Sequence, residues 1–193
     1  MGIIANRRNL ASQNEDLVYP GEVADASANK SWCVVYTNVR HEKTVNSLLS
    51  NKSIETFLPL REVLTQWKDR RKKVQLPLFP GYIFVRILEN GARSILNILN
   101  TKGVVRILSS NGSYETVPAH QVDSIRLLVD TKVEYDPYKY LVKGKEVVVV
   151  NGPLQGVSGK ILERKGQNRL IVSIDIIKRS VSVEVDPADI ELV

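Results

Sequence analysis

The sequence predicts an α+β domain, with an antiparallel sheet and packed helices, followed by a small all-β barrel. Up to about residue 130, strand-length apolar runs alternate with segments of helical spacing. Residues 131–140 sustain neither period and predict a linker, and short strands between Gly-rich turns then fill 141–193. The 193 residues suffice for two small domains, and a hydrophobic content of 43% allows a core.

Residues 1–29 are rich in Asn, Ala and Ser and show no sustained periodicity, so we expect a flexible extension. No apolar run approaches the roughly 20 residues that a membrane helix needs. The opening MGIIANRRNL is too short and too polar for a secretory signal. We therefore expect a cytoplasmic protein without a membrane partner.

The first domain, 30–130, begins with the β-branched and aromatic run WCVVYTNV, which predicts a strand. Val45, Leu48 and Leu49 then recur at helical spacing. The runs EVLTQW and VQLPLF alternate on either side of KDRRKK and predict a β-hairpin with a basic tip. GYIFVRI is apolar throughout, which favours a central strand.

Two helices and one strand complete this domain. ARSILNILNTKG predicts a helix that ends at Gly103, and VVRIL predicts a strand. HQVDSIRLLV predicts the last helix. The order β-α-β-β-β-α-β-α indicates helices packed on an antiparallel sheet. The side chains expected to point inward are Ile95, Ile98 and Leu99 of the first helix and Val122, Ile125, Leu128 and Val129 of the second.

The positive charge is concentrated in the first domain. Residues 30–130 hold 15 Lys/Arg against 8 Asp/Glu, whereas 141–193 hold 8 against 7. A field of this kind attracts polyanions such as nucleic acids. The single cysteine, Cys33, excludes an internal disulfide, and with only His41 and His120 as histidines we expect no metal site.

The hairpin tip has two interpretations that the residues leave open. Its five cations repel one another, so they need either solvent or an anionic partner. A flexible basic ribbon with Trp67 at its base suits a phosphate backbone, because Arg and Trp stack on bases. The cations are Lys68, Arg70, Arg71, Lys72 and Lys73.

The glycines of GPLQGVSGK do not form a phosphate loop. Leu154 stands where the first glycine is required, and Ile161 replaces the Ser/Thr. We expect Gly152, Gly156 and Gly159 at positions of positive φ or of close strand approach. No nucleophile, base and orienting partner stand out together, so we expect neither an enzyme nor a cofactor.

The stretch PLFPGYIFVR decides the functional question. In a strand, Tyr82 and Phe84 fall on one face, and Ile83 and Val85 fall on the other. Phe79 precedes the Pro80–Gly81 turn, outside this alternation. From the residues alone it is either core or part of an exposed docking surface.

In their order, WCVVYTNVRHEK, PLFPGYIFVR, TKGVVRIL and VKGKEVVVVNGPLQGVSGKI resemble the NusG family of transcription elongation factors. The first three resemble its N-terminal NGN domain, and the last resembles the KOW motif of its SH3-like barrel, here Gly152, Pro153, Gly156 and Gly159. RHEK, GVVRIL and KRSVSVEVD are closest to specialised UpxY-like antiterminators of capsular polysaccharide operons.

The resemblance implies binding to the clamp helices of RNA polymerase, which suppresses pausing and termination. It assigns Phe79, Trp32 and Tyr82 to the polymerase-binding patch. It places Arg40, His41 and Lys43 toward nucleic acid, either non-template DNA or nascent RNA. The barrel partner it implies is Rho or a ribosomal small-subunit protein.

The sequence departs from the family at Ser94 to Asn97, SILN, where one paralogue has a Thr-rich polymerase contact. An alternative function is that of a ribosome-associated KOW protein that binds RNA directly. That alternative predicts a basic barrel, and the balance of 8 cations to 7 anions in 141–193 is against it.

Overall fold

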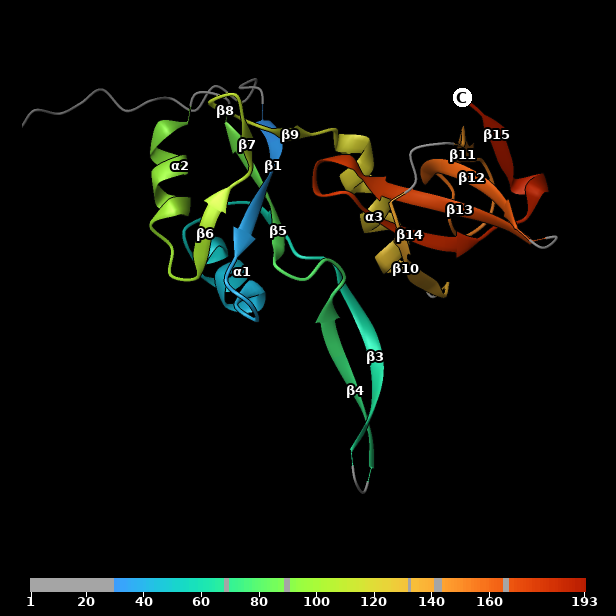
Figure 1. Cartoon of the computed structure of the whole chain (residues 1–193), viewed down its shortest axis with the longest axis horizontal. Helices are drawn as coiled ribbons and strands as arrows, with labels where there is room; N and C mark the ends of the chain where they lie inside the picture. The colour runs from blue at the N-terminus through green and yellow to red at the C-terminus, as the bar shows by residue number, and fades with distance from the viewer. Residues whose placement is uncertain (1–29, 68–69, 89–90, 132, 141–143, 165–166) are drawn as a thin grey trace, which may run out of the picture.

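The computed structural model describes residues 30–67, 70–88, 91–131, 133–140, 144–164 and 167–193. A helix-flanked sheet and a β-barrel lie on either side of helix α3 (Figure 1). This arrangement of helices and antiparallel strands confirms the predicted fold class. The extension expected at 1–29 lies outside the described residues. In the part of the chain that is described, no helix is long and apolar enough to cross a membrane.

The first unit contains three helices and nine of the described strands. Its helices are α1 (Glu42–Asn51), α2 (Ala92–Leu99) and α3 (Ala119–Asp130). Its strands are β1 (Lys30–Thr37), β2 (Thr56–Phe57), β3 (Leu60–Trp67), β4 (Arg70–Pro77), β5 (Tyr82–Leu88), β6 (Val104–Ile107), β7 (Ser109–Ser110), β8 (Ser113–Tyr114) and β9 (Thr116–Val117).

The main sheet has the order β2-β5-β1-β6, and β9 also pairs with β1. Strand β5 is central, as predicted, because it pairs with both β1 and β2. Ile83 and Val85 point to the face that α1 and α2 cover, whereas Phe84 points to the opposite face. The period of two in GYIFVRI therefore predicted both faces correctly.

Helix α2 differs from its prediction at two points. It ends at Leu99, and Gly103 lies in the following turn with φ of +96°. Ile98 is buried, but Leu99 is 38% exposed, so the expectation that Leu99 points inward is wrong. The helix has only eight residues and packs at the β6 edge of the sheet, so its buried stripe is narrow.

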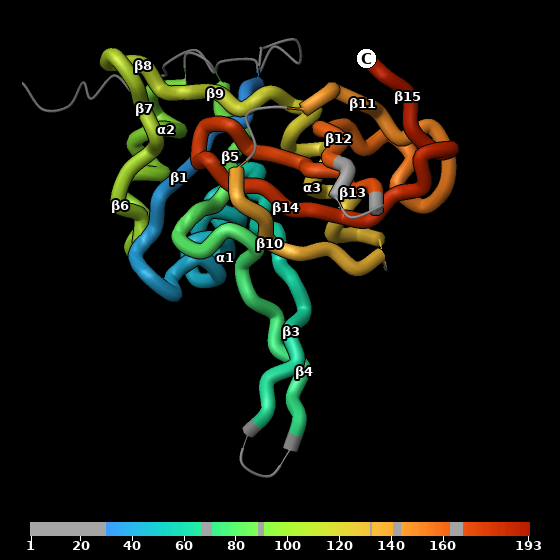
Figure 2. Tube along the Cα trace, turned by 45° about the vertical axis from the view of Figure 1, so that its right-hand side comes forward, coloured from blue at the N-terminus to red at the C-terminus, as the bar shows by residue number. Residues whose placement is uncertain are grey.

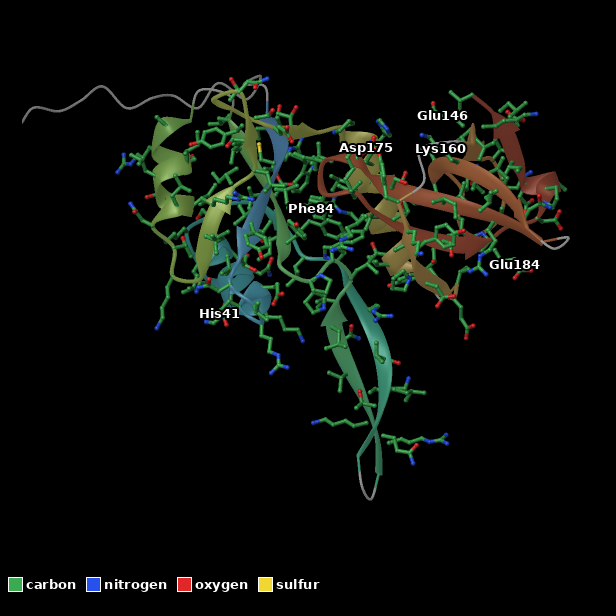
Figure 3. All side chains as sticks on the ribbon, viewed as in Figure 1. His41, Phe84, Glu146, Lys160, Asp175 and Glu184 are labelled. Carbon is green, nitrogen blue, oxygen red and sulfur yellow. The ribbon has the colours of Figure 1, made fainter. Side chains whose placement is uncertain are left out.

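Helix α3 covers the face of the sheet that carries Phe84 (Figure 3). Val122, Ile125 and Leu128 are fully buried, and Val129 is partly buried, as the helical period predicted. The same apolar cluster continues into the interior of the barrel. Helix α3 therefore packs between the two units instead of belonging to the sheet alone.

The second unit is a six-stranded antiparallel sheet in the order β10-β14-β13-β12-β11-β15. Short 3-10 helices lie at Asp175–Ile177 and Pro187–Asp189. Its strands are β10 (Tyr135–Lys139), β11 (Lys145–Val149), β12 (Ser158–Arg164), β13 (Gln167–Ile174), β14 (Arg179–Glu184) and β15 (Ile190–Leu192).

Strand β10 lies inside the stretch predicted as linker, 131–140, so the expectation that no strand forms there is wrong. It pairs with β14 from Tyr135–Val183 to Lys139–Arg179. Pro137 argued against a strand in the sequence. An edge strand tolerates a proline, however, at a position where the backbone nitrogen faces solvent and no hydrogen bond of the sheet is lost. The boundaries of the two domains stay a prediction.

Two glycines in the turn between β11 and β12, and a third inside β12, have the geometry that the sequence predicted. Gly152 and Gly156 have φ of +78° and +90°. Gly159 lies where a Cβ atom would stand 2.5 Å from the carbonyl oxygen of Ile171. Turn geometry and strand approach thus account for these positions.

Candidate functional site

Phe79 and Trp32 lie in an aromatic cluster on the sheet face that α3 covers. The Phe79 ring meets the Phe84 ring edge to face with centroids 6.2 Å apart, and Phe57 lies 5.9 Å from Phe84. Phe79 is 3% exposed and Trp32 is 4% exposed. The expectation that Phe79 lies on an open surface is therefore not met in this conformation.

Helix α3 covers the aromatic cluster. The sequence predicted that this helix packs on the sheet, but not that it buries Phe79 and Trp32. The Arg126 guanidinium lies 5.6 Å from the centroid of the Trp32 ring and 5.1 Å from that of Phe57. Ile125 and Leu128 join the same cluster. The burial of the aromatic face thus depends on α3 staying in place.

Tyr82 lies at the partly open end of this face. Its ring centroid is 5.4 Å from that of Tyr36, and both side chains are half-buried. Arg106 lies 5.9 Å from the Tyr36 ring. Sequence reasoning missed Tyr36, although the alternation Trp32, Val34, Tyr36 placed it on this face.

The Pro80–Gly81 turn positions Phe79 and Tyr82. The Tyr82 N–H donates to the Phe79 carbonyl at 3.1 Å, and Gly81 has φ of +85°, which is the geometry of a type II turn. The Gly81 N–H donates to Glu42 Oε1 at 2.7 Å, and the Glu42 side chain is only 5% exposed. A buried carboxylate of α1 therefore fixes the turn.

Polar contacts join α3 to the barrel at two places. Gln121 Nε2 donates to Asp175 Oδ2 at 2.6 Å, and Ser124 lies 3.1 Å from Ser158, hydroxyl to hydroxyl. Asp175 directly follows β13, beside α3 (Figure 3), and its carboxylate accepts a second hydrogen bond from the Tyr140 hydroxyl at 2.7 Å. Asp175 is thus the centre of a small hydrogen-bonded cluster.

Burial raises the pKa of Asp175, but the hydrogen bonds from Tyr140 and Gln121 and the charges of Lys160 and Lys178 outweigh it. The net pKa lies below the ordinary value of 3.8. A lowered pKa means that the charged carboxylate stabilises the folded state above pH 3.8. That contribution is lost as the pH falls through the lowered value.

We expect Asp175→Asn to reduce the free energy of unfolding at pH 7 by about 1 kcal/mol or less, since the carboxylate is exposed to solvent. Thermal unfolding of both proteins between pH 2 and pH 7, at matched ionic strength, measures the difference. The two proteins should converge at the acidic end, where Asp175 is protonated. A constant difference across the range would contradict the role of the charge.

The described part of the basic hairpin is exposed, as a nucleic-acid contact requires. Lys73 Nζ lies 2.7 Å from Glu62 Oε1, whereas Arg71 and Lys72 have exposed side chains. Lys68 and the side chains of Trp67 and Arg70 lie outside the described residues. The hairpin projects away from both the sheet and the barrel (Figures 1 and 2).

The loop before α1 brings further basic residues to the hairpin side of the sheet. Arg40 is exposed and has φ of +63°, which is uncommon for a residue with a side chain. His41 Nδ1 lies 3.0 Å from the Val39 carbonyl oxygen. Lys43 Nζ donates to the Gln75 carbonyl at 2.6 Å, so this lysine anchors the hairpin besides any contact with nucleic acid.

A cavity of about 350 Å³ lies between the first turn of α3 and the barrel. Its lining includes His120, Gln121, Lys160 and Asp175. Opposite charges share it, so it favours neither an anion nor a cation. Among the described residues, no group of three His, Cys, Asp or Glu side chains could hold a metal ion.

Comparison with known proteins identifies a common family. A family model described as "Transcription termination factor nusG" matches residues 30–126, half of the chain. The NusG protein of Lactococcus lactis, a transcription termination/antitermination protein, is 24% identical over 86% of this chain and 94% of its own. The corresponding protein of Pseudomonas aeruginosa is 26% identical over 85% of this chain and 99% of its own.

A solved structure described as "Domain interaction in Thermotoga maritima NusG" has the same fold. The TM-score is 0.50 at 22% sequence identity, and the match covers 84% of this chain and 97% of the other. The match includes both the helix-flanked sheet and the barrel, in agreement with the expected NGN and KOW folds. The chain therefore belongs to the NusG family of transcription termination and antitermination factors.

Proposed function

We propose that this NusG-family protein is an elongation and antitermination factor that binds the clamp helices of RNA polymerase. Phe79, Trp32 and Tyr82 would form the docking face, and binding would suppress pausing and termination. The observation that supports this most is the aromatic face itself: three phenylalanines, a tryptophan and a tyrosine pair lie together on one face of the sheet. Aromatic clusters of this kind are the usual energetic centres of protein interfaces.

Docking requires that α3 or the barrel first leave the aromatic face, because Phe79 and Trp32 are buried here. Polymerase would then replace the contacts that Ile125, Leu128 and Arg126 make in the closed conformation. Because polymerase would bury apolar side chains that opening exposes, its binding would offset part of the free-energy cost of opening.

Nucleic acid would be contacted at the same time by the hairpin cations and by Arg40 and His41. These residues lie on one side of the sheet, where the hydrogen bond from Lys43 to the Gln75 carbonyl joins α1 to the hairpin. The sequence details that resemble UpxY-like factors favour polysaccharide-type operons as targets. The barrel would recruit Rho or a ribosomal small-subunit protein, for which its near-neutral charge is suitable.

The test is a pull-down of the full chain with the matching core RNA polymerase. We expect Phe79→Ala to reduce binding at least about tenfold, since buried aromatic anchors dominate interfaces. Val85→Ala is the matched control, because Val85 is fully buried on the opposite face of the same sheet. It also creates a cavity in the core, although a smaller one, and should leave binding intact once the protein is folded.

Thermal unfolding establishes which variants are folded, and Phe79→Leu replaces Phe79→Ala where the smaller residue unfolds the chain. Wild-type affinity in a folded Phe79 variant would overturn the docking face. If the wild-type chain does not bind polymerase, ribosomal RNA becomes the next partner to test. In that case Phe79 is simply a core residue.

A further inference from the structure

The β3–β4 hairpin is a two-stranded ribbon that extends into solvent. It contains eight residue pairs, from Leu60–Pro77 to Trp67–Arg70. At about 3.3 Å per residue these pairs give a length of roughly 26 Å. Isolated two-stranded ribbons are only marginally stable in water, so a long projecting one suggests that a partner surrounds it.

The two faces of the ribbon differ in charge. One face, here called the Lys72 face, consists of Arg61, Val63, Thr65, Lys72, Val74 and Leu76. The other, the Lys73 face, consists of Glu62, Leu64, Gln66, Arg71, Lys73 and Gln75. Among these side chains Glu62 is the one carboxylate, and its ion pair with Lys73 at 2.7 Å offsets a cation on its own face. The Lys72 face thus has two cations and no anion among its described residues.

The shape of the Lys72 face suits a groove. Val63 pairs directly with Val74, and Thr65 pairs with Lys72, so short β-branched side chains occupy its middle. Such side chains keep the profile of the ribbon low and let its backbone approach a partner closely. Two strands about 4.8 Å apart, with their side chains, fit a major groove about 12 Å wide.

Single strands and RNA duplexes fit this surface less well. Single strands need several aromatic platforms in a basic groove, and among the positions paired in the ribbon Trp67, in its last pair, is the one aromatic residue. The ribbon is moreover a projection, not a groove (Figure 2). The major groove of an RNA duplex is too narrow and deep for side chains to reach its bases.

We propose that the ribbon inserts into the major groove of double-stranded DNA with its Lys72 face toward the base pairs. This inference rests on the proposed contact of the hairpin with nucleic acid. Lys72 contacts a phosphate at the edge of the groove, and Thr65, directly opposite, offers a hydroxyl to a base edge. Lys73, paired with Glu62, then points away from the duplex, so this inference removes it from the hairpin cations proposed above to contact nucleic acid.

Fluorescence anisotropy of the full chain tests this with a short mixed-sequence DNA duplex, one of its strands, and an RNA duplex of the same sequence. Binding is measured between about 50 and 200 mM salt. Lys72→Gln is compared with Lys73→Gln, since these neighbours differ in face and not in the charge removed. We expect the DNA duplex to bind most tightly, and Lys72→Gln to reduce the salt slope by about one. Lys73→Gln should change the slope by less than half as much.

Tighter binding of the single strand or of the RNA duplex would overturn the inference, as would equal slopes for the two variants. The polymerase pull-down separates this result from the proposed function. Duplex binding without polymerase binding leaves the ribbon assignment intact and removes the docking face. Polymerase binding without a preference for the DNA duplex leaves the docking face intact and removes the ribbon assignment.

Discussion

Glu42→Ala should lower the free energy of unfolding by about 2–3 kcal/mol, because it leaves the buried Gly81 N–H without an acceptor. The carboxylate is 5% exposed, so water cannot easily replace it. Glu42→Gln keeps an acceptor oxygen in place and should cost about 1 kcal/mol. Urea unfolding followed by circular dichroism measures both values.

Glu55→Ala is a suitable control for the charge alone. Its carboxylate pairs with Arg86 at 3.5 Å on the surface, where such a pair contributes less than about 1 kcal/mol. If Glu42→Ala costs no more than Glu55→Ala, the hydrogen bond to Gly81 does not stabilise the turn. Polymerase binding gives a second measurement, since a loosened turn displaces Phe79 and Tyr82 even in a folded variant.

The hydrogen bond between Glu42 and Gly81 could not be predicted from the sequence. The carboxylate is in the first turn of α1, a common place for an acidic residue, because it favours the positive end of the helix. Its partner is 39 residues further along the chain, and no local pattern links the two. Only the packing of α1 against β5 brings them together.

Features set by a local period could be predicted. The two faces of β5 followed from alternation, and the inward residues of α3 followed from helical spacing. The hairpin followed from two alternating runs, but the prediction that Arg70 to Lys73 form its tip is wrong, because these residues pair with β3 as the first half of β4. Strand β10 could not be predicted in this way, because its charges and its proline reflect an edge position that exists only once β14 is in place.

The basic part of the candidate site could be predicted from the sequence, but the burial of its aromatic part could not. The basic residues of the hairpin adjoin one another in the sequence, so their grouping was visible at once. The burial of Phe79 was not, because it depends on a helix that begins forty residues later and on a barrel beyond it. Tertiary contacts of high sequence separation thus decide whether the aromatic face is exposed or buried.

Gly159→Ala should have the largest effect on the barrel. A Cβ atom at this position would stand 2.5 Å from the Ile171 carbonyl oxygen and 3.1 Å from its carbonyl carbon. Backbone atoms of a central strand cannot move aside as a flexible side chain does, so β12 and β13 must separate. We expect a loss of about 3 kcal/mol or more in the free energy of unfolding. In a chain of this length that lowers Tm by about 6–12 °C.

Gly112→Ala is the control variant. It has the general effect of replacing glycine, without the close approach of an added Cβ atom to a neighbouring strand. An added Cβ there meets nothing within 4 Å, and its φ of +81° leaves only backbone strain of about 1–2 kcal/mol. Equal losses in the two variants would show that β12 and β13 tolerate the extra atom. A larger loss for Gly159→Ala has a consequence for the other unit as well. Because Ser124 of α3 contacts Ser158 beside this glycine, a distorted β12 weakens the contact that holds α3 between the two units.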